Sequence, residues 1–229
     1  PEGCGGGAAP LGLSIQRNSQ NQSRYGMSGI TAAGRRFVKR SCMLMNDIRS
    51  RLAMWTIHLP DEDYAEMVGN KKWAAFQRRI LDLLGRYLKE NGDPALVVGV
   101  CELGEERLAR DLRPRPHIHI VTTGWGSHAA SGGWLLRPEV MDELVDKAAQ
   151  YAGLSSRPRA AGSRVEPVRK SCAAYMAKYL TKAVKPDKVD LSDGWDCLLP
   201  RQWWLASDAA RALVYGNLAK LPVGFAAFL

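Results

Sequence analysis

Two histidines separated by one residue are the first feature of the sequence that could do chemistry. His117 and His119 lie in the run from Arg115 to Thr123, which is rich in strand-forming residues. Because alternate residues of a strand point to the same face, both imidazoles are expected on one face and Ile118 on the other. Two neutral imidazole nitrogens side by side suit two ligands of one divalent ion.

A carboxylate on a neighbouring strand could complete this metal site. Glu102 lies near the end of the run from Ala95 to Leu103, and a charged loop containing Gly104 connects this run to the histidines. Antiparallel pairing of the two runs would bring Glu102 beside the histidines. Glu105 and Glu106 are the alternative third ligands. Glu102 could instead be a solvated charge at the end of its strand, with no role in metal binding. Two histidines and a carboxylate leave room for water and a phosphate oxygen, which suits Mg²⁺ or Mn²⁺ acting on a phosphodiester. A zinc hydrolase is the competing use.

The second chemical feature is a pair of tyrosines in a predicted helix from Ser171 to Val184. At about 100° per residue, Tyr175 and Tyr179 share one arc with Lys178 and Lys182, opposite a set of apolar side chains. Tyrosines that served only in packing would lie in the apolar arc. Neighbouring ammonium groups would favour the phenolate over the phenol and would neutralise a phosphate. The pattern therefore predicts tyrosines that attack a phosphate.

The elements that would hold these residues alternate between strand and helix. Alternating and helical periodicities predict strands at 51–59, 95–103, 115–123 and 163–168, and helices at 63–90, 138–151 and 171–184. This β-α-β-β-α-β-α order is typical of an α+β, ferredoxin-like (split βαβ) fold with a mainly antiparallel central sheet and helices on one face. The central strands of such a sheet can present residues on the open face.

Charge and composition narrow the choice of partner and compartment. The 229 residues carry 32 lysines and arginines against 23 acidic residues, a net charge of +9, which favours a polyanionic partner without choosing between DNA, RNA and a membrane surface. No apolar run approaches the roughly 20 residues that span a bilayer, and the first residues lack the order of a secretory signal. We therefore expect a cytoplasmic protein without a membrane partner.

Three motifs, taken in order, resemble those of the HUH endonucleases. The resemblance is to rolling-circle replication initiators with two active-site tyrosines, such as the gene A initiators of small single-stranded DNA phages. The run Met54–Leu59 looks like the family's first motif, and His117-Ile118-His119 is similar to its metal-binding His-hydrophobic-His motif. The run Tyr175–Lys182 resembles its doubled Tyr-x-x-Lys motif. The resemblance covers roughly residues 51 to 184.

The resemblance implies a metal-dependent single-strand DNA endonuclease and strand transferase that initiates rolling-circle replication. A metal on His117, His119 and Glu102 would polarise the scissile phosphate of single-stranded or melted origin DNA. A tyrosine would then attack and leave a 5′-phosphotyrosine and a free 3′-OH that primes synthesis. Tyr175 and Tyr179 would take turns in successive rounds, and a host helicase and polymerase would be partners.

Composition and the span of the matching motifs predict where the domain begins and ends. Residues 1–30 are rich in glycine and polar residues and are predicted to form a flexible tail, and the nicking domain is predicted at 45–186. Residues 187–229 form an extension that we expect to pack on this domain. Its paired tryptophans, Trp203 and Trp204, could dock the extension or stack on bases.

Other uses of the same residues stay open at this point. A relaxase or a transposase of the same superfamily would share the chemistry. Relaxases usually have a third metal-binding histidine, and single-tyrosine transposases need only one nucleophile, so the two histidines and two tyrosines of this sequence favour an initiator. A non-catalytic module that binds single-stranded nucleic acid would carry aromatic residues on its central strands, where this sequence has histidines.

Two further groups of residues could reach DNA or the site. A basic cluster precedes the tyrosine helix and could follow a DNA backbone or belong to a loop without a specific role; it consists of Arg157, Arg159, Arg164, Arg169 and Lys170. His58 shares a strand face with Thr56 and Met54 and could approach the metal site.

Overall fold

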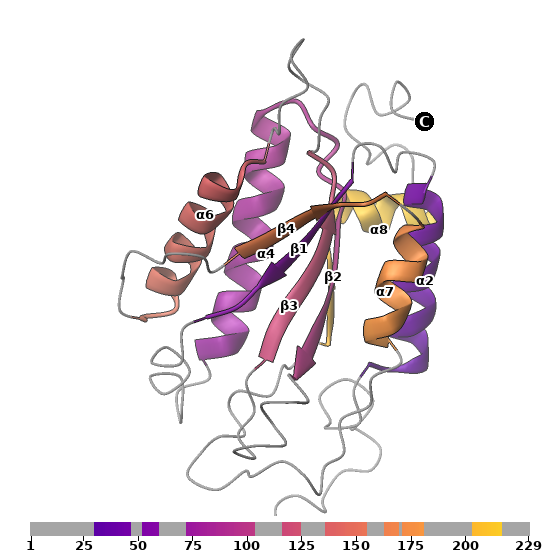
Figure 1. The fold of residues 1–229 in the computed structure, drawn as a ribbon, viewed down its shortest axis with the longest axis horizontal. Helices are drawn as coiled ribbons and strands as arrows, with labels where there is room; N and C mark the ends of the chain where they lie inside the picture. Colours follow the sequence, from indigo (N-terminus) through magenta and orange to yellow (C-terminus); the bar gives the residue numbers. More distant parts are fainter. Residues whose placement is uncertain are drawn as a thin grey trace, which may run out of the picture.

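The computed structural model describes residues 30–46, 52–59, 72–103, 116–124, 136–154, 163–169, 171–180 and 203–216. Five strands and five helices lie in these ranges (Figure 1). In chain order they are α2 (Ala32–Met45), β1 (Ala53–Ile57), α4 (Lys72–Glu90), β2 (Val97–Leu103), β3 (Pro116–Thr122), α6 (Pro138–Tyr151), β4 (Ser163–Pro167), α7 (Cys172–Leu180), β5 (Trp204–Ala206) and α8 (Asp208–Tyr215).

The strands form one antiparallel sheet in the order β4-β1-β3-β2-β5. β3 lies between β1 and β2 and pairs antiparallel with both, so β1 and β2 run parallel and need a crossover connection, in which α4 lies. Thr56 of β1 and Val100 of β2 are the residues opposite His119 of β3. The α+β class and the antiparallel central sheet predicted from the sequence are confirmed.

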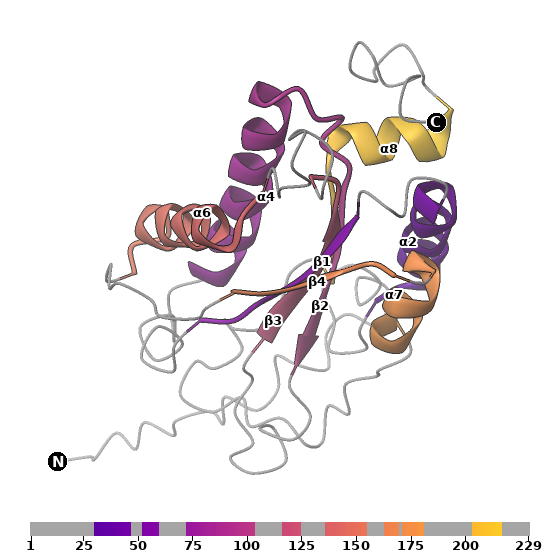
Figure 2. The same ribbon diagram turned by 45° about the horizontal axis from the view of Figure 1, so that its top comes forward.

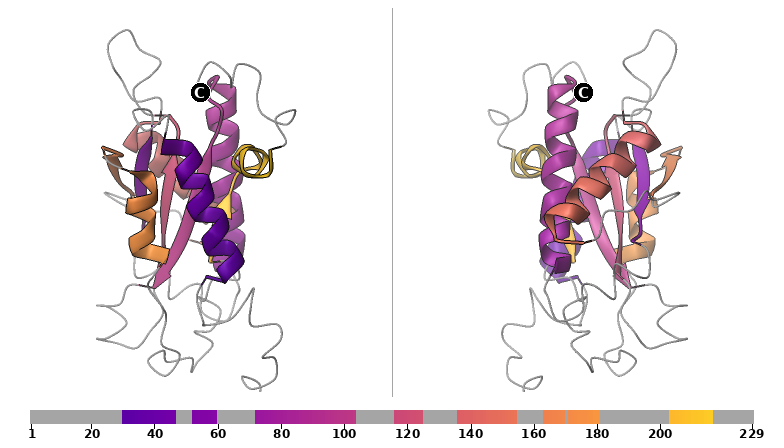
Figure 3. Two further views of the ribbon diagram at one scale, coloured as in Figure 1. Left: turned by 90° about the vertical axis from the view of Figure 1, so that its right-hand side faces the viewer. Right: turned by 90° about the vertical axis from the view of Figure 1, so that its left-hand side faces the viewer.

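Helices cover both faces of this sheet, so the prediction of helices on one face is wrong. Gln77 of α4 donates a hydrogen bond to the Cys101 sulfur, and Cys101 lies opposite Ile118 in the sheet. Tyr179 of α7 instead stacks on His119. Because Ile118 and His119 are consecutive strand residues, they point to opposite faces, and α4 and α7 therefore lie on opposite sides. Figure 3 shows α2 and α7 in front of the sheet from one side and α6 from the other.

The periodic apolar residues of α4 explain why it forms a helix and which face it buries. Trp73, Phe76, Ile80, Leu84 and Leu88 are all at most 1% exposed. Burial of each such side chain stabilises the fold by roughly 1.5–3 kcal/mol. The predicted start of this helix at residue 63 lies outside the described residues. None of the helices in the described ranges has the length and apolarity needed to cross a membrane.

The first and last described helices pack against each other, and α2 lies on the histidine side of the sheet. Phe37 of α2 contacts the Trp204 ring of β5 at a centroid distance of 4.6 Å and the Tyr215 ring of α8 at 5.8 Å. Figure 2 shows α8 beside one end of α2. A Cβ on Gly34 would lie 2.6 Å from the Trp204 indole, so a glycine is needed for α2 to approach β5 this closely. α2 was not predicted from the sequence, and β5 adds part of the C-terminal extension to the sheet beside β2.

Candidate active site

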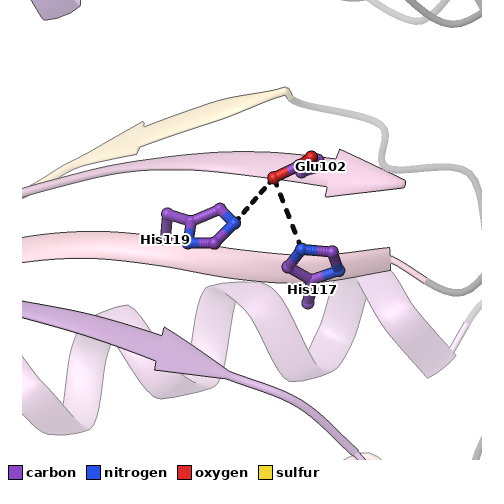
Figure 4. Close-up of side chains that lie close together, drawn as sticks. All are labelled: Glu102, His117 and His119. Carbon is purple, nitrogen blue, oxygen red and sulfur yellow. Dashed lines mark hydrogen bonds and ion pairs between the residues drawn. The ribbon is translucent and has the colours of Figure 1, made fainter. Parts of the chain in front are cut away.

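The three residues predicted as metal ligands meet at one end of the β2–β3 pair. The register places Glu102 opposite His117, and Glu102 Oε2 lies 3.4 Å from His117 Nε2 and 2.8 Å from His119 Nε2. Figure 4 shows both imidazoles turned toward the carboxylate. One ligand atom from each residue lies within 4.8 Å of the other two, so Glu102, His117 and His119 form a cluster that could hold a metal ion.

The protonation state of His119 suits a ligand role. The residue is 5% exposed, and burial, followed by the charges of His117 and Lys178, lowers its pKa to about 3. His119 is therefore neutral near pH 7 and keeps a lone pair on one ring nitrogen. The set of two imidazole nitrogens and one carboxylate oxygen fits a divalent ion.

Thr56 fixes the orientation of the His119 ring from the neighbouring strand. Its Oγ1 lies 3.1 Å from His119 Nδ1, while Glu102 lies at Nε2. In the tautomer that leaves the Nε2 lone pair available for a metal, Nδ1–H donates to the Thr56 hydroxyl. The β1–β3 register places Thr56 directly opposite His119, so strand pairing alone could have identified it.

A cleft of about 610 Å³ opens beside the ligand cluster, between the sheet and α7. This volume is in the range of ordinary ligand sites. Its lining consists of Met54, Thr56, His58, His117, His119, Glu166, Ala174, Tyr175, Lys178 and Tyr179. Two ligand residues, both tyrosines and one of the two predicted lysines therefore share one cavity, whereas Lys182 lies outside the described residues.

Burial of α7 on one side turns its two tyrosines toward the cleft. Cys172 and Met176 are fully buried, whereas Tyr175 and Tyr179 are half-buried and Lys178 is exposed. The Tyr179 ring stacks on the His119 imidazole at a centroid distance of 3.7 Å and an interplanar angle of 17°. A phenol ring thus lies directly against a residue of the ligand cluster.

The protein's own residues do not favour ionisation of Tyr179. Burial, followed by the charges of Glu166 and Tyr175, raises the pKa of this phenol above its usual value. Lys178 Nζ lies 5.6 Å from the Tyr179 ring centroid, and its charge does not outweigh these effects. The net shift of the Tyr179 pKa is therefore opposite in direction to the one expected from neighbouring lysines, of which Lys182 lies outside the described residues.

Comparisons of the chain with known proteins give no further guide to the site. No family model, curated protein or solved structure matches the chain. The chemistry of the cleft therefore has to be inferred from its own residues.

Two polar residues that line the cleft, His58 and Glu166, are not among the metal ligands or nucleophiles predicted from the sequence. The His58 ring lies 5.3 Å from the His117 ring between centroids, on the side away from Glu102 in the strand order. Glu166 of β4 lies opposite Met54 and shares its strand face, which is how it enters the cleft. Strand alternation in 163–167 could have pointed to Glu166.

Several residues that were expected to bind the metal or DNA do not line the cleft or lie outside the described residues. Glu105, Glu106 and most of the basic cluster lie outside the described ranges, and Arg169 is exposed. Trp203 is buried, and Trp204 packs on Phe37 with the Arg211 guanidinium 5.1 Å from its ring centroid. Both tryptophans are therefore used in packing within the fold.

Proposed function

We propose that the protein is a divalent-metal-dependent single-strand DNA endonuclease and strand transferase that initiates rolling-circle replication through tyrosine attack. The observation that carries this proposal is the stacking of the Tyr179 ring on the His119 ring, with 3.7 Å between the ring centroids. Tyr175 lines the same cleft. A metal-ligand cluster that served only hydrolysis by water would not need two half-buried tyrosines facing it. Single-stranded or melted origin DNA is the proposed substrate.

The strand connections support an HUH-type domain of the ferredoxin-like, split βαβ kind. In the order β4-β1-β3-β2, each of the two outer strands of the unit follows a helix that crosses the sheet, with α4 before β2 and α6 before β4. The edge strand β5 and the helices α2 and α8 are additions to that unit.

The proposed reaction uses the ligand cluster to place a phosphate beside the tyrosines. Glu102, His117 and His119 would hold Mg²⁺ or Mn²⁺, which supplies positive charge to a phosphate oxygen when bound. The tyrosine oxygen then forms a bond to phosphorus, the P–O3′ bond breaks, and the phenol proton passes to water. The products are a 5′-phosphotyrosine and a 3′-OH after the leaving oxygen takes a proton from water.

Two tyrosines allow the covalent step to be repeated. Tyr175 and Tyr179 are one helical turn apart, about 6 Å along the axis, and both line the cleft. One could hold the nicked 5′ end while the other cuts the regenerated origin. Lys178 is exposed in the same cleft and can neutralise the phosphate. A host helicase and polymerase are the proposed partners.

A zinc hydrolase is the second candidate, because two histidines and one carboxylate also form a catalytic zinc set. Such an enzyme would activate water and would leave no DNA on the protein. A relaxase or transposase of the same superfamily would form the same adduct as an initiator.

Covalent capture of DNA tests the proposal. A pool of 3′-labelled single-stranded oligonucleotides with a randomised centre is incubated with the protein and Mn²⁺ and then separated on a denaturing gel. We expect a labelled band that migrates with the protein and is lost in Tyr175→Phe/Tyr179→Phe. EDTA and His117→Ala should also remove it while DNA binding is largely retained. An undiminished adduct in the double variant would contradict the proposal.

A further inference from the structure

A second groove lies on the other side of the sheet from the tyrosine cleft. It has a volume of about 430 Å³ and is lined by α4, by Tyr151 at the end of α6, and by residues 206–208, which lead into α8. The α4 side chains in its lining are Arg78, Arg79, Leu81, Asp82, Arg86 and Lys89, together with Gly85. None of these residues contributes to the proposed active site.

Basic side chains dominate this groove. Four arginines and lysines face two aspartates, Asp82 and Asp208. Asp82 is shared, because its Oδ2 lies 3.1 Å from Arg79 Nη1 and 2.8 Å from Arg86 Nη2. Arg78 and Lys89 pair with no acidic group among the described residues, so the groove keeps a net positive charge.

The basic residues follow a line along the helix. Arg78 and Lys89 are eleven residues apart, which corresponds to about 16 Å along the axis and only about 20° around it. Arg86 lies on the same side of α4. A row of cations of this length matches a polyanionic strand laid along the helix better than a single small anion.

Gly85 lies between these cations in α4, and no neighbouring atom in the described part of the chain requires a glycine at this position. A Cβ at this position would meet nothing within 4 Å, and a glycine in a helix interior costs about 1 kcal/mol relative to alanine. The missing side chain leaves the helix backbone accessible in the groove. Close approach of a ligand to the backbone is a common reason for glycine at such a place.

Tyr151 adds an aromatic surface to the same groove. Its side chain is 66% exposed, and the Arg79 guanidinium lies 4.8 Å from its ring centroid. Proteins that bind single-stranded nucleic acid combine a basic groove for the backbone with aromatic and arginine planes on which unpaired bases stack. Duplex DNA would not offer its bases to this ring.

We propose that this groove binds a second segment of single-stranded DNA, outside the strand held in the tyrosine cleft. The proposal rests on the proposed DNA substrate but uses none of the catalytic residues. Phosphates would contact Arg78, Arg86 and Lys89, and a base would stack on Tyr151. Because α4 and α7 lie on opposite faces of the sheet, this segment would belong to DNA that flanks the scissile site.

Charge reversal tests the backbone contacts. Binding of a fluorescein-labelled 30-nucleotide oligo-dT is measured by anisotropy in EDTA over a range of salt, so that the result does not depend on nicking. Arg78→Glu/Lys89→Glu should weaken binding at least tenfold and lower the salt slope by about two. Lys147→Glu changes an exposed lysine of α6 outside the groove and should leave binding within twofold. Equal affinity and slope in the double variant and the wild type would overturn the proposal.

Variants of Tyr151 and Gly85 test whether the groove binds a nucleic acid or another kind of anion. Tyr151→Ala should weaken oligo-dT binding about tenfold, and Gly85→Leu should weaken it while raising the thermal unfolding temperature. An oligo-dT containing 5-iodouracil should photo-crosslink to the peptide that holds Tyr151. Crosslinks confined to the tyrosine cleft, or stronger binding of poly-glutamate than of oligo-dT, would refute the proposal even if nicking is observed.

Discussion

At the residue scale, the site depends on how His119 is held. Thr56 lies at its Nδ1, Glu102 at its Nε2, and the Tyr179 ring on its face. Burial keeps the imidazole neutral, with its pKa lowered to about 3. The proposed nucleophile Tyr179 is therefore in direct contact with the proposed ligand His119, and a substitution of one should change the properties of the other.

Thr56 is expected to tune metal affinity without being a ligand. Thr56→Val removes the acceptor at His119 Nδ1 and should weaken Mn²⁺ binding by roughly 10- to 100-fold, as for other residues that orient a ligand. Thr56→Ser keeps the hydroxyl and serves as the matched control. Isothermal titration calorimetry with Mn²⁺ measures both. Equal affinity in the valine and serine variants would show that the hydroxyl does not orient the ligand.

Glu166 is expected to add to the effect of burial on the pKa of Tyr179. Its negative charge contributes to the raised pKa of the phenol, so Glu166→Gln should lower that pKa toward the usual value of about 10. Ultraviolet titration of each protein, with the Tyr179→Phe spectrum subtracted, reports this single phenol. Glu90→Gln, at the exposed end of α4, is the control. A pKa that is unchanged in Glu166→Gln would remove the carboxylate from the account.

At the element scale, α7 is positioned by the end of α2. Asn46 Oδ1 accepts a hydrogen bond from the Cys172 amide at 2.8 Å, and Asn46 Nδ2 donates to Ser171 Oγ at 3.3 Å. The first bond satisfies a backbone amide that a helix start leaves without an intrahelical partner, and the second holds the Ser171 hydroxyl beside it. A helix far away in sequence thus anchors the start of the tyrosine helix.

Loss of this anchor should affect both stability and reaction. Asn46→Ala is expected to lower the free energy of unfolding by about 1 kcal/mol, as for other capping residues, and to slow adduct formation because α7 loses its fixed start. Asn46→Asp retains the acceptor and is the control. Urea unfolding measures the first effect and the adduct assay the second. Unchanged unfolding of Asn46→Ala would contradict this role.

An element can be predicted from the sequence when the pattern that determines it lies within its own residues, and not when the element depends on contacts with distant segments. α6 was predicted at its observed bounds because its apolar residues recur at helical spacing after Pro138. α2 is not predicted from the sequence because Phe37, Val38 and Cys42 lie among many basic residues, and because it packs on α7, on α8 and on Trp204, all far along the chain. β5 has three residues and depends on pairing with β2.

The residues of the candidate site could be predicted more fully than the arrangement of helices on the two faces of the sheet. Strand alternation placed His117 and His119 together, and hairpin pairing added Glu102. The apolar side of α7 indicated that the helix is buried, but not against which face of the sheet. That choice depends on contacts between α7 and α2, and it decides that the tyrosines face the histidines.

At the scale of the whole molecule, the sheet separates two surfaces with different chemistry. The tyrosine cleft lies on the side of α2 and α7, and the basic groove along α4 lies on the other. In the proposed reaction, the protein would hold the strand that it cuts and keep contact with flanking DNA. Two separate surfaces would allow both contacts at once.

The most direct test of the central claim is to find the residue that becomes attached to DNA. The protein is incubated with Mn²⁺ and single-stranded DNA, the DNA is digested with nuclease, and tryptic peptides are examined by tandem mass spectrometry. The account predicts a nucleotide linked through its 5′-phosphate to Tyr175 or Tyr179, which share the cleft with His117 and His119. A nucleotide on any other residue, or cleavage of the DNA without a protein adduct, would contradict it.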